Sequence, residues 1–306
     1  FIIINILLYR FIFRQRYNYR KNIKNFWKSN KNRKSIVVTT VMIWISWRIN
    51  MAYQITDILQ RCTKDDAEFI ATTLNSYVNF TDDKGMKEML SMWQSGPMPI
   101  ALAQKFEKEI RYVASSDIAY GARKIRGIEP AGIDIDELID DVCTVMKIPI
   151  KKVGTIEGKL EYLAKRIVDK TFMEQPPEEQ VNILKKLNIS EEQVKKILKD
   201  IKEHKEKLIP VLVIILGKEA ALNFANTILI GIIVVFVGKK TAEQLLKVLI
   251  TKMPWLAALG PMAIVGLTGW TLLDICGPAT RKTIPLTLHL GILSLRNSIE
   301  NEKNWE

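Results

Sequence analysis

The chain has 306 residues, of which 48% are hydrophobic, and this composition supports a packed core and excludes global disorder. Its formal net charge of +12 would suit a protein that binds nucleic acid or a membrane surface. The charge is unevenly placed, because residues 1–50 hold eleven Lys and Arg and no Asp or Glu. Residues 51–306 are therefore nearly neutral, and we expect no nucleic-acid partner.

Residues 1–50 also differ from the rest of the chain in pattern. They are rich in Ile, Asn, Lys, Arg, Phe and Tyr and show neither a helix period nor a strand period. We interpret them as non-native sequence translated upstream of a natural start at Met51, or as a disordered basic segment. The alternative is a basic membrane anchor, although the apolar stretches 1–9 and 35–47 are shorter than the ~20 residues of a spanning helix.

Residues that could carry catalysis or bind a metal are few. The three cysteines, Cys62, Cys143 and Cys276, are far apart, and the two histidines are His204 and His289. This spacing argues against a Cys/His zinc site, and scattered thiols suit a reducing cytoplasm. We predict no catalytic residue, no cofactor and no metal site, and an enzyme is the least favoured function.

From Met51 onward the chain has the pattern of amphipathic helices, and we predict an all-α helical bundle. The expected parts are a short N-terminal helical module over 51–96, an amphipathic helical domain over 97–207 and an apolar helical region over 208–306. Thr63 is expected to cap one helix, and Ser190 with Gln193 has the spacing of a capping box. The acidic run 134–141 is interpreted as the opening of a helix, with a metal site as the alternative.

Two apolar helix faces are expected to face a core. They comprise Leu102, Phe106, Ile110 and Val113 in one helix, and Ile135, Leu138, Ile139 and Val142 in the next. A later helix is expected to turn Val194, Ile197, Leu198 and Ile201 inward and to carry a stripe of lysines on its other face.

The C-terminal region holds the longest apolar segments. Residues 220–238 and 254–273 carry no charge and approach the length of a membrane span. A short turn then leads into a second apolar run, 283–295, and we predict that this run folds back on 254–273 as a hairpin. The residues given a role in this turn are Asp274, Gly277, Pro278, Arg281, Thr283 and Pro285. We expect Gly277 and Pro278 to break the chain and Asp274 to pair with Arg281, and Pro285 is tolerated in the first turn of the next helix.

The turn sequence GPATRKTIP, residues 277–285, resembles the C-terminal signature of the YaaW-like family of uncharacterised bacterial proteins. In that family an aromatic residue stands where this chain has Thr280, and an apolar one where it has Lys282. The resemblance continues through 53–74 and short blocks between 116 and 143. It implies a helical protein distantly related to the ubiquinol–cytochrome c chaperone domain, which acts on another protein rather than as a catalyst.

We therefore expect a non-enzymatic protein that is membrane-associated through its apolar C-terminal hairpin and acts by protein–protein interaction, in the manner of a chaperone or assembly factor. We expect the protein to be cytoplasmic and to associate with the inner membrane as a peripheral or integral protein. Its expected partners are an unidentified protein and membrane lipid. The main alternative is a soluble bundle in which the hairpin forms the buried core, including the case of an effector that inserts only when triggered.

Overall fold

The computed structural model describes residues 53–75, 83–115, 117–127, 131–185, 187, 189–204, 207–237, 242–243 and 280–300. Within these ranges the chain forms twelve helices and no strand, which confirms the predicted all-α fold class. Residues Tyr53–Glu306 make up one compact unit. The interpretations given to residues 1–50 lie outside the described residues, and the internal domain boundaries expected from the sequence stay predictions.

The N-terminal part consists of short helices. They are α4 (Thr56–Leu59), α5 (Lys64–Asn75), α6 (Asp83–Met92), α7 (Ile100–Val113) and α8 (Asp117–Ile125). Thr63 caps α5 as predicted, because its hydroxyl accepts a hydrogen bond from the Asp66 amide at 3.2 Å and the Asp66 carboxylate accepts one from the Thr63 amide at 2.9 Å. The predicted apolar face of α7 is fully buried.

The middle of the chain forms four helices, and three of them have a capped start. They are α9 (Ile135–Val145), α10 (Ile156–Met173), α11 (Pro177–Lys185) and α12 (Glu191–His204). Asp134 and Thr155 cap α9 and α10. Ser190 and Gln193 form the predicted reciprocal box before α12. The acidic run therefore opens α9, and its four predicted apolar residues are buried.

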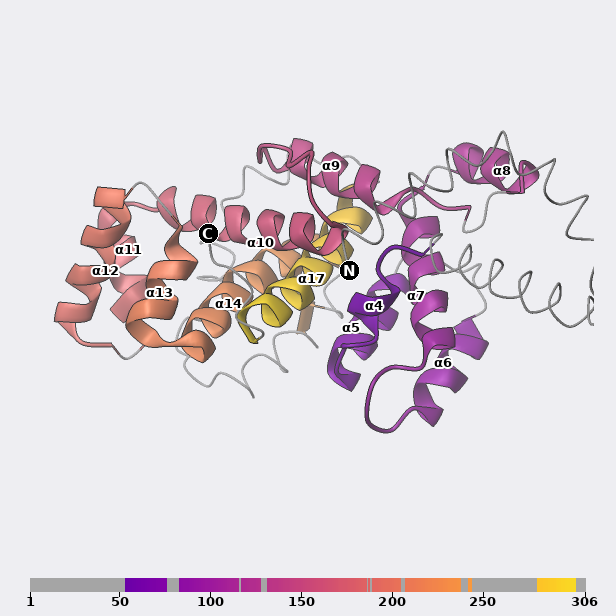
Figure 1. The fold of residues 1–306 in the computed structure, drawn as a ribbon, viewed down its shortest axis with the longest axis horizontal. Helices are drawn as coiled ribbons and strands as arrows, with labels where there is room; N and C mark the ends of the chain where they lie inside the picture. The colour runs from indigo at the N-terminus through magenta and orange to yellow at the C-terminus, as the bar shows by residue number, and fades with distance from the viewer. Residues whose placement is uncertain are drawn as a thin grey trace, which may run out of the picture. The chain divides into compact units, whose positions relative to one another are not determined.

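The C-terminal part contains α13 (Leu208–Leu216), α14 (Lys218–Phe236) and α17 (Thr280–Glu300). Figure 1 shows α17 running beside α14 with α10 across their upper ends, and α10 and α14 are the two main neighbours of α17. All side chains described from 283 to 298 are buried except that of Arg296, which is partly exposed. A helix buried on every side is a core helix, so α17 is the element around which the described bundle is built.

Close approach of α17 to α10 depends on Gly291. A Cβ atom added there would lie 3.2 Å from the Ala164 Cβ and 3.2 Å from the Leu160 carbonyl oxygen. The glycine lets the two backbones approach, which increases the area that both helices bury. α17 also contacts α4, α5, α7 and α9, so the C-terminal helix ties the N-terminal helices to the rest of the bundle.

A buried carboxylate joins α4 to α7. Glu107 is fully buried and accepts hydrogen bonds from the Gln54 amide at 2.6 Å, the Ile55 amide at 3.0 Å and the Thr56 hydroxyl at 3.0 Å. Burial raises the pKa of Glu107, whereas these hydrogen bonds and the nearby Arg111 act in the opposite direction. The carboxylate thus serves as a cap for α4 supplied by another helix.

Candidate functional site

The turn residues predicted from the sequence lie at the edge of what the structure describes. Asp274, Gly277 and Pro278 fall outside the described residues, as do 254–273, on which α17 was predicted to fold back. Arg281 lies in the first turn of α17, but its side chain is not described. The hairpin with 254–273 and the pair between Asp274 and Arg281 therefore stay predictions.

Thr283 and Pro285 are both buried within α17. Pro285 is the sixth residue of the helix, one turn later than the position considered from the sequence. It lacks the amide hydrogen that would bond to the Arg281 carbonyl, so α17 loses one backbone hydrogen bond there. The remaining described contacts of α17 are with neighbouring helices, and these fix its place in the bundle.

The surface feature most suited to binding is α13, whose nine residues are all apolar, LIPVLVIIL. One side of the helix is buried through Leu208, Ile209 and Leu212. On the other side the Ile214 side chain is 80% exposed, with Val211 and Ile215 partly exposed beside it. This partly uncovered apolar face is the candidate binding surface of the described helices.

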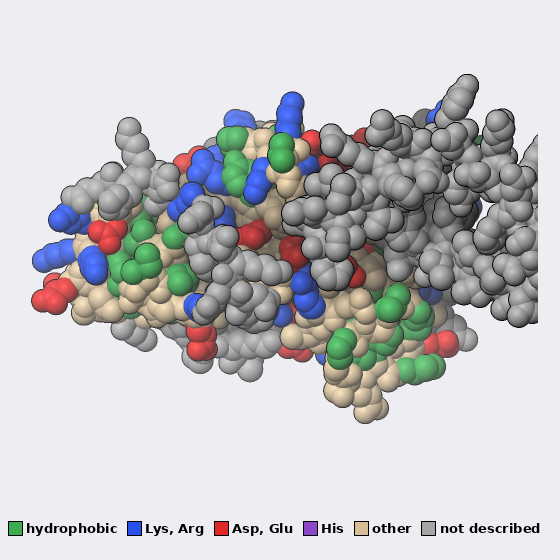
Figure 2. Space-filling view, in the orientation of Figure 1, with side chains coloured by type: hydrophobic (Ala, Val, Ile, Leu, Met, Phe, Trp, Pro, Cys, Tyr) green, Lys and Arg blue, Asp and Glu red, His purple; other side chains and the backbone are tan. Residues whose placement is uncertain are grey.

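Exposed charged side chains, both lysines and glutamates, lie close to α13 along the chain and on the neighbouring helix. Lys207 and Lys218 are exposed immediately before and after α13. The neighbouring helix α12 packs against α13 and presents exposed lysines of the predicted stripe, Lys195, Lys196, Lys199 and Lys202. Figure 2 shows hydrophobic side chains gathered at this end of the molecule, with both basic and acidic side chains around them.

Among the described helices, α14 is the one long and apolar enough to cross a membrane by length and composition. Its apolar side chains are largely used inside the protein, because Phe224, Leu229 and Ile232 are among its ten buried residues. It packs against α10, α13 and α17. Insertion of α14 across a bilayer would require these contacts to break, whereas the exposed face of α13 is available in the folded protein.

A cluster of buried polar groups joins α5 to the C-terminal half of α17. The Arg296 guanidinium donates two hydrogen bonds to the Asp66 carboxylate, at 2.9 and 3.0 Å. The His289 Nε2 lies 3.7 Å from the same carboxylate, and the His289 ring stacks against Phe69 with 4.3 Å between centroids. Burial alone would raise the pKa of Asp66, but the hydrogen bonds from Arg296 and Thr63 hold it well below its usual range.

The chemistry of this cluster is that of a structural ion pair. Burial lowers the pKa of His289 to about 4, so its imidazole is neutral at physiological pH. The nearby Cys62 thiol is buried, and burial together with the charge of Asp66 raises its pKa far above its ordinary value. A protonated thiol is a poor nucleophile, so Cys62, His289 and Asp66 do not make an activated catalytic group.

Two glutamates of α10 make further polar contacts beside this cluster. Glu157 accepts hydrogen bonds from Arg61, at 2.8 Å, and from Asn297. Glu161 accepts one from the Ser298 hydroxyl at 2.8 Å. Sequence reasoning assigned Asp66 only to the first turn of its helix and missed its partner, because Arg296 lies 230 residues away. No local pattern signals a contact of that separation.

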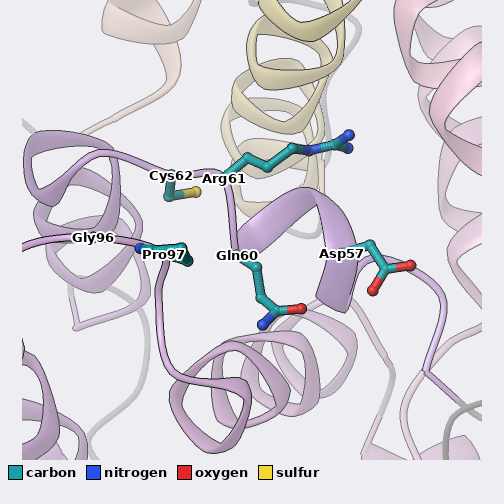
Figure 3. Close-up of a pocket in the computed structure, with 6 residues that line it drawn as sticks. All are labelled: Asp57, Gln60, Arg61, Cys62, Gly96 and Pro97. Carbon is teal, nitrogen blue, oxygen red and sulfur yellow. The ribbon is translucent and has the colours of Figure 1, made fainter.

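An open pocket of about 660 Å³ lies beside α4. Figure 3 shows Asp57 on the helix, Gln60, Arg61 and Cys62 just after it, and the Gly96–Pro97 loop opposite. The pocket offers one carboxylate and one guanidinium, and the latter is already paired with Glu157. This lining can bind a polar or peptide-like group, but it supplies no general base next to a nucleophile.

Comparison of the chain with protein-family models, with curated proteins and with solved structures found no match. The resemblance of residues 277–285 to the YaaW-like family accordingly stays a prediction.

Proposed function

We propose that the protein is a non-enzymatic helical protein that attaches to the anionic cytoplasmic surface of a membrane through α13. The observation that carries this proposal is the outward face of α13, an apolar surface bordered by lysines. Attachment through this face differs from the spanning hairpin considered from the sequence, because it leaves the helices α14 and α17 in the core of the bundle.

The energetics of such an attachment follow from the exposed residues. Transfer of one exposed isoleucine side chain, such as that of Ile214, into an apolar environment contributes roughly 1.5–3 kcal/mol to the binding free energy. Each lysine near an anionic lipid surface adds about 1 kcal/mol, and Lys207 and Lys218 are exposed close to the two ends of α13. A few such contributions give reversible, salt-sensitive binding of a peripheral kind.

We further propose that the attached protein binds a protein partner through its N-terminal helices. This second surface is supported by the pocket beside α4 and by two exposed apolar side chains that flank the same loop, Met92 at 75% and Ile100 at 55% exposure. An assembly or chaperone role, which the YaaW-like resemblance also implies, would place the membrane contact and the partner contact on different helices.

The membrane proposal is tested by co-sedimentation of the full chain with vesicles of phosphatidylcholine and phosphatidylglycerol. Ile214→Asp should weaken binding at least tenfold, since it removes the most exposed apolar side chain of α13 and adds a repelled charge. Ile125→Asp is the matched control, because Ile125 is a helical isoleucine with 90% exposure on α8.

The two variants distinguish attachment through α13 from nonspecific adsorption of the protein to vesicles. Vesicle binding that falls equally in both variants, or in neither, would contradict attachment through α13. Circular dichroism of both variants checks that the fold is kept. Comparison of variants within the full chain also cancels any contribution that residues 1–50 make to lipid binding.

A further inference from the structure

A second pocket, of about 300 Å³, lies at the start of α13. We call it the basic pocket, because four of its lining residues are positively charged and one is acidic. The charged residues are Lys147, Arg166, Lys170, Lys207 and Asp169. Its volume is that of a small-ligand site, and its charge favours an anion.

The backbone at two of these lysines is unusual. Lys147 and Lys207 are the two non-glycine residues with positive φ among the described residues, at 53° and 44°. The left-handed conformation costs roughly 1–2 kcal/mol for a residue with a Cβ atom. Both strained positions line the same pocket, although they are 60 residues apart in the sequence.

The local motif shows that glycine would serve the fold better at Lys147. This residue follows the cap of α9, where the Lys147 amide bonds to the Thr144 carbonyl at 3.2 Å and the Ile148 amide bonds to the Cys143 carbonyl at 2.8 Å. These two bonds define a Schellman ending, and glycine is the usual residue at this point. A lysine in its place adds strain and contributes a charged side chain to the pocket, which indicates a role for the side chain.

The other basic groups are positioned for an anion. Lys170 is held by a hydrogen bond from its Nζ to the Met146 carbonyl at 2.9 Å. The Arg166 guanidinium is 3.9 Å from Asp169, too far for a hydrogen bond, and its side chain is 43% exposed. A planar guanidinium in this state can give two parallel hydrogen bonds to a phosphate group.

Asp169 can take part in binding in its protonated form. Its Oδ1 accepts a hydrogen bond from the Leu208 amide at 3.0 Å, and its Oδ2 is buried without a hydrogen-bond partner among the described residues. Burial raises the pKa of Asp169 to about 6. Arg166 and Lys165 on α10 and Lys207 before α13 oppose this rise. Lys147 and Lys170 also line the basic pocket. Protonation of Asp169 removes the one negative charge among the lining residues of the basic pocket.

We propose that the basic pocket binds a phosphate group, borne by a lipid headgroup or by a soluble ligand. The inference depends on the geometry of the pocket and not on membrane attachment through α13. Since an ionised Asp169 repels an anion and a protonated one does not, binding should strengthen as the pH falls from about 7.5 towards 5.5.

Calorimetric titration of the full chain with inorganic phosphate tests the site. The double variant Lys147→Gly, Lys207→Gly should bind at least tenfold more weakly while its melting temperature is equal or higher, because both changes relieve backbone strain. Lys64→Ala with Lys124→Ala is the charge-matched control on exposed lysines elsewhere, and it should bind phosphate as the wild type does. Equal binding by the wild type and the glycine variant, or no binding by the wild type, would overturn the proposal.

A second titration uses sulfate, which does not change its charge between pH 5.5 and 7.5. Wild-type affinity should rise several-fold at the lower pH, whereas Asp169→Asn should bind about equally well at both. A pH dependence that persists unchanged in Asp169→Asn would remove Asp169 from the site.

Vesicles containing phosphatidic acid distinguish the two sources of the phosphate. The single variant Lys147→Gly is used here, because Lys207 also lies next to the proposed membrane surface. With a lipid ligand, Lys147→Gly loses vesicle binding and soluble phosphate competes in the wild type. With a soluble ligand, Lys147→Gly loses phosphate binding alone. Ile214→Asp serves as the separate test of membrane attachment, because it should leave the phosphate titration unchanged even where vesicle binding is lost.

Discussion

The ion pair between Asp66 and Arg296 offers the sharpest test of how the bundle is held together. The two side chains are 11% and 23% exposed, and the pair joins α5 to the core helix α17. Arg296→Leu would leave the Asp66 carboxylate buried without its main partner. Loss of one partner of a buried pair costs about 3–5 kcal/mol, and the partial exposure of Arg296 favours the lower end, about 3 kcal/mol. For a unit of this size that corresponds to a fall in melting temperature of about 6–12 °C.

The pH dependence of the loss identifies its cause. In Arg296→Leu, burial should raise the pKa of Asp66 above its unfolded value, so the ionised carboxylate is the destabilised form. Protonation then relieves the penalty, and the deficit relative to the wild type should shrink as the pH falls from 7 to about 4. Chemical denaturation at several pH values measures this directly.

A variant that removes a more exposed ion pair serves as the control for the loss of stability in Arg296→Leu. Arg61→Leu removes the more exposed ion pair with Glu157, where the Arg61 side chain is 41% exposed, and should cost less than about 1 kcal/mol. If Arg296→Leu costs no more than Arg61→Leu, or if its deficit is independent of pH, the ion pair does not stabilise the contact between α5 and α17.

Three further predictions concern other buried groups. Gly132→Ala should destabilise the fold by about 2–3 kcal/mol, because the added Cβ would lie 2.3 Å from the Arg111 Cβ. Gly121→Ala on α8 is the control, because its Cβ meets nothing within 4 Å, and it should stabilise the fold by roughly 0.5–1 kcal/mol. Thermal denaturation compares the two variants. Glu107→Ala should cost about 3 kcal/mol in the same assay, since it leaves buried amide groups at the start of α4 unpaired. The lowered pKa of His289 means that the unfolded chain binds its proton near pH 6.5 and the folded one only near pH 4. Stability should therefore fall between these pH values by up to about 3 kcal/mol, and His289→Gln should reduce that fall in a pH series of denaturation curves.

Features governed by neighbouring residues could be predicted from the sequence. The caps at Thr63 and Ser190 depend on partners three residues away, and both were confirmed. The buried faces of α7 and α9 follow from the helical period, because residues three and four apart share one side. The all-α fold class follows from the same periodicity.

Features that depend on distant residues could not be predicted in this way. The partner of Asp66 lies in the last described helix, and an apolar run such as α13 does not indicate which of its sides is covered. The basic pocket was missed for a related reason, since Lys147 and Lys207 are unremarkable lysines in the sequence. Their significance comes from backbone conformation and from the packing of α9 and α10 near the start of α13.

The central claim, that α13 touches the membrane, is tested most directly by a fluorophore at its exposed face. An environment-sensitive probe attached through Ile214→Cys in the full chain should shift to shorter wavelength and brighten on addition of phosphatidylglycerol vesicles. The same probe attached through Ile125→Cys on α8 should not respond. An unchanged spectrum at the α13 position, or an equal response at both positions, would contradict attachment through α13.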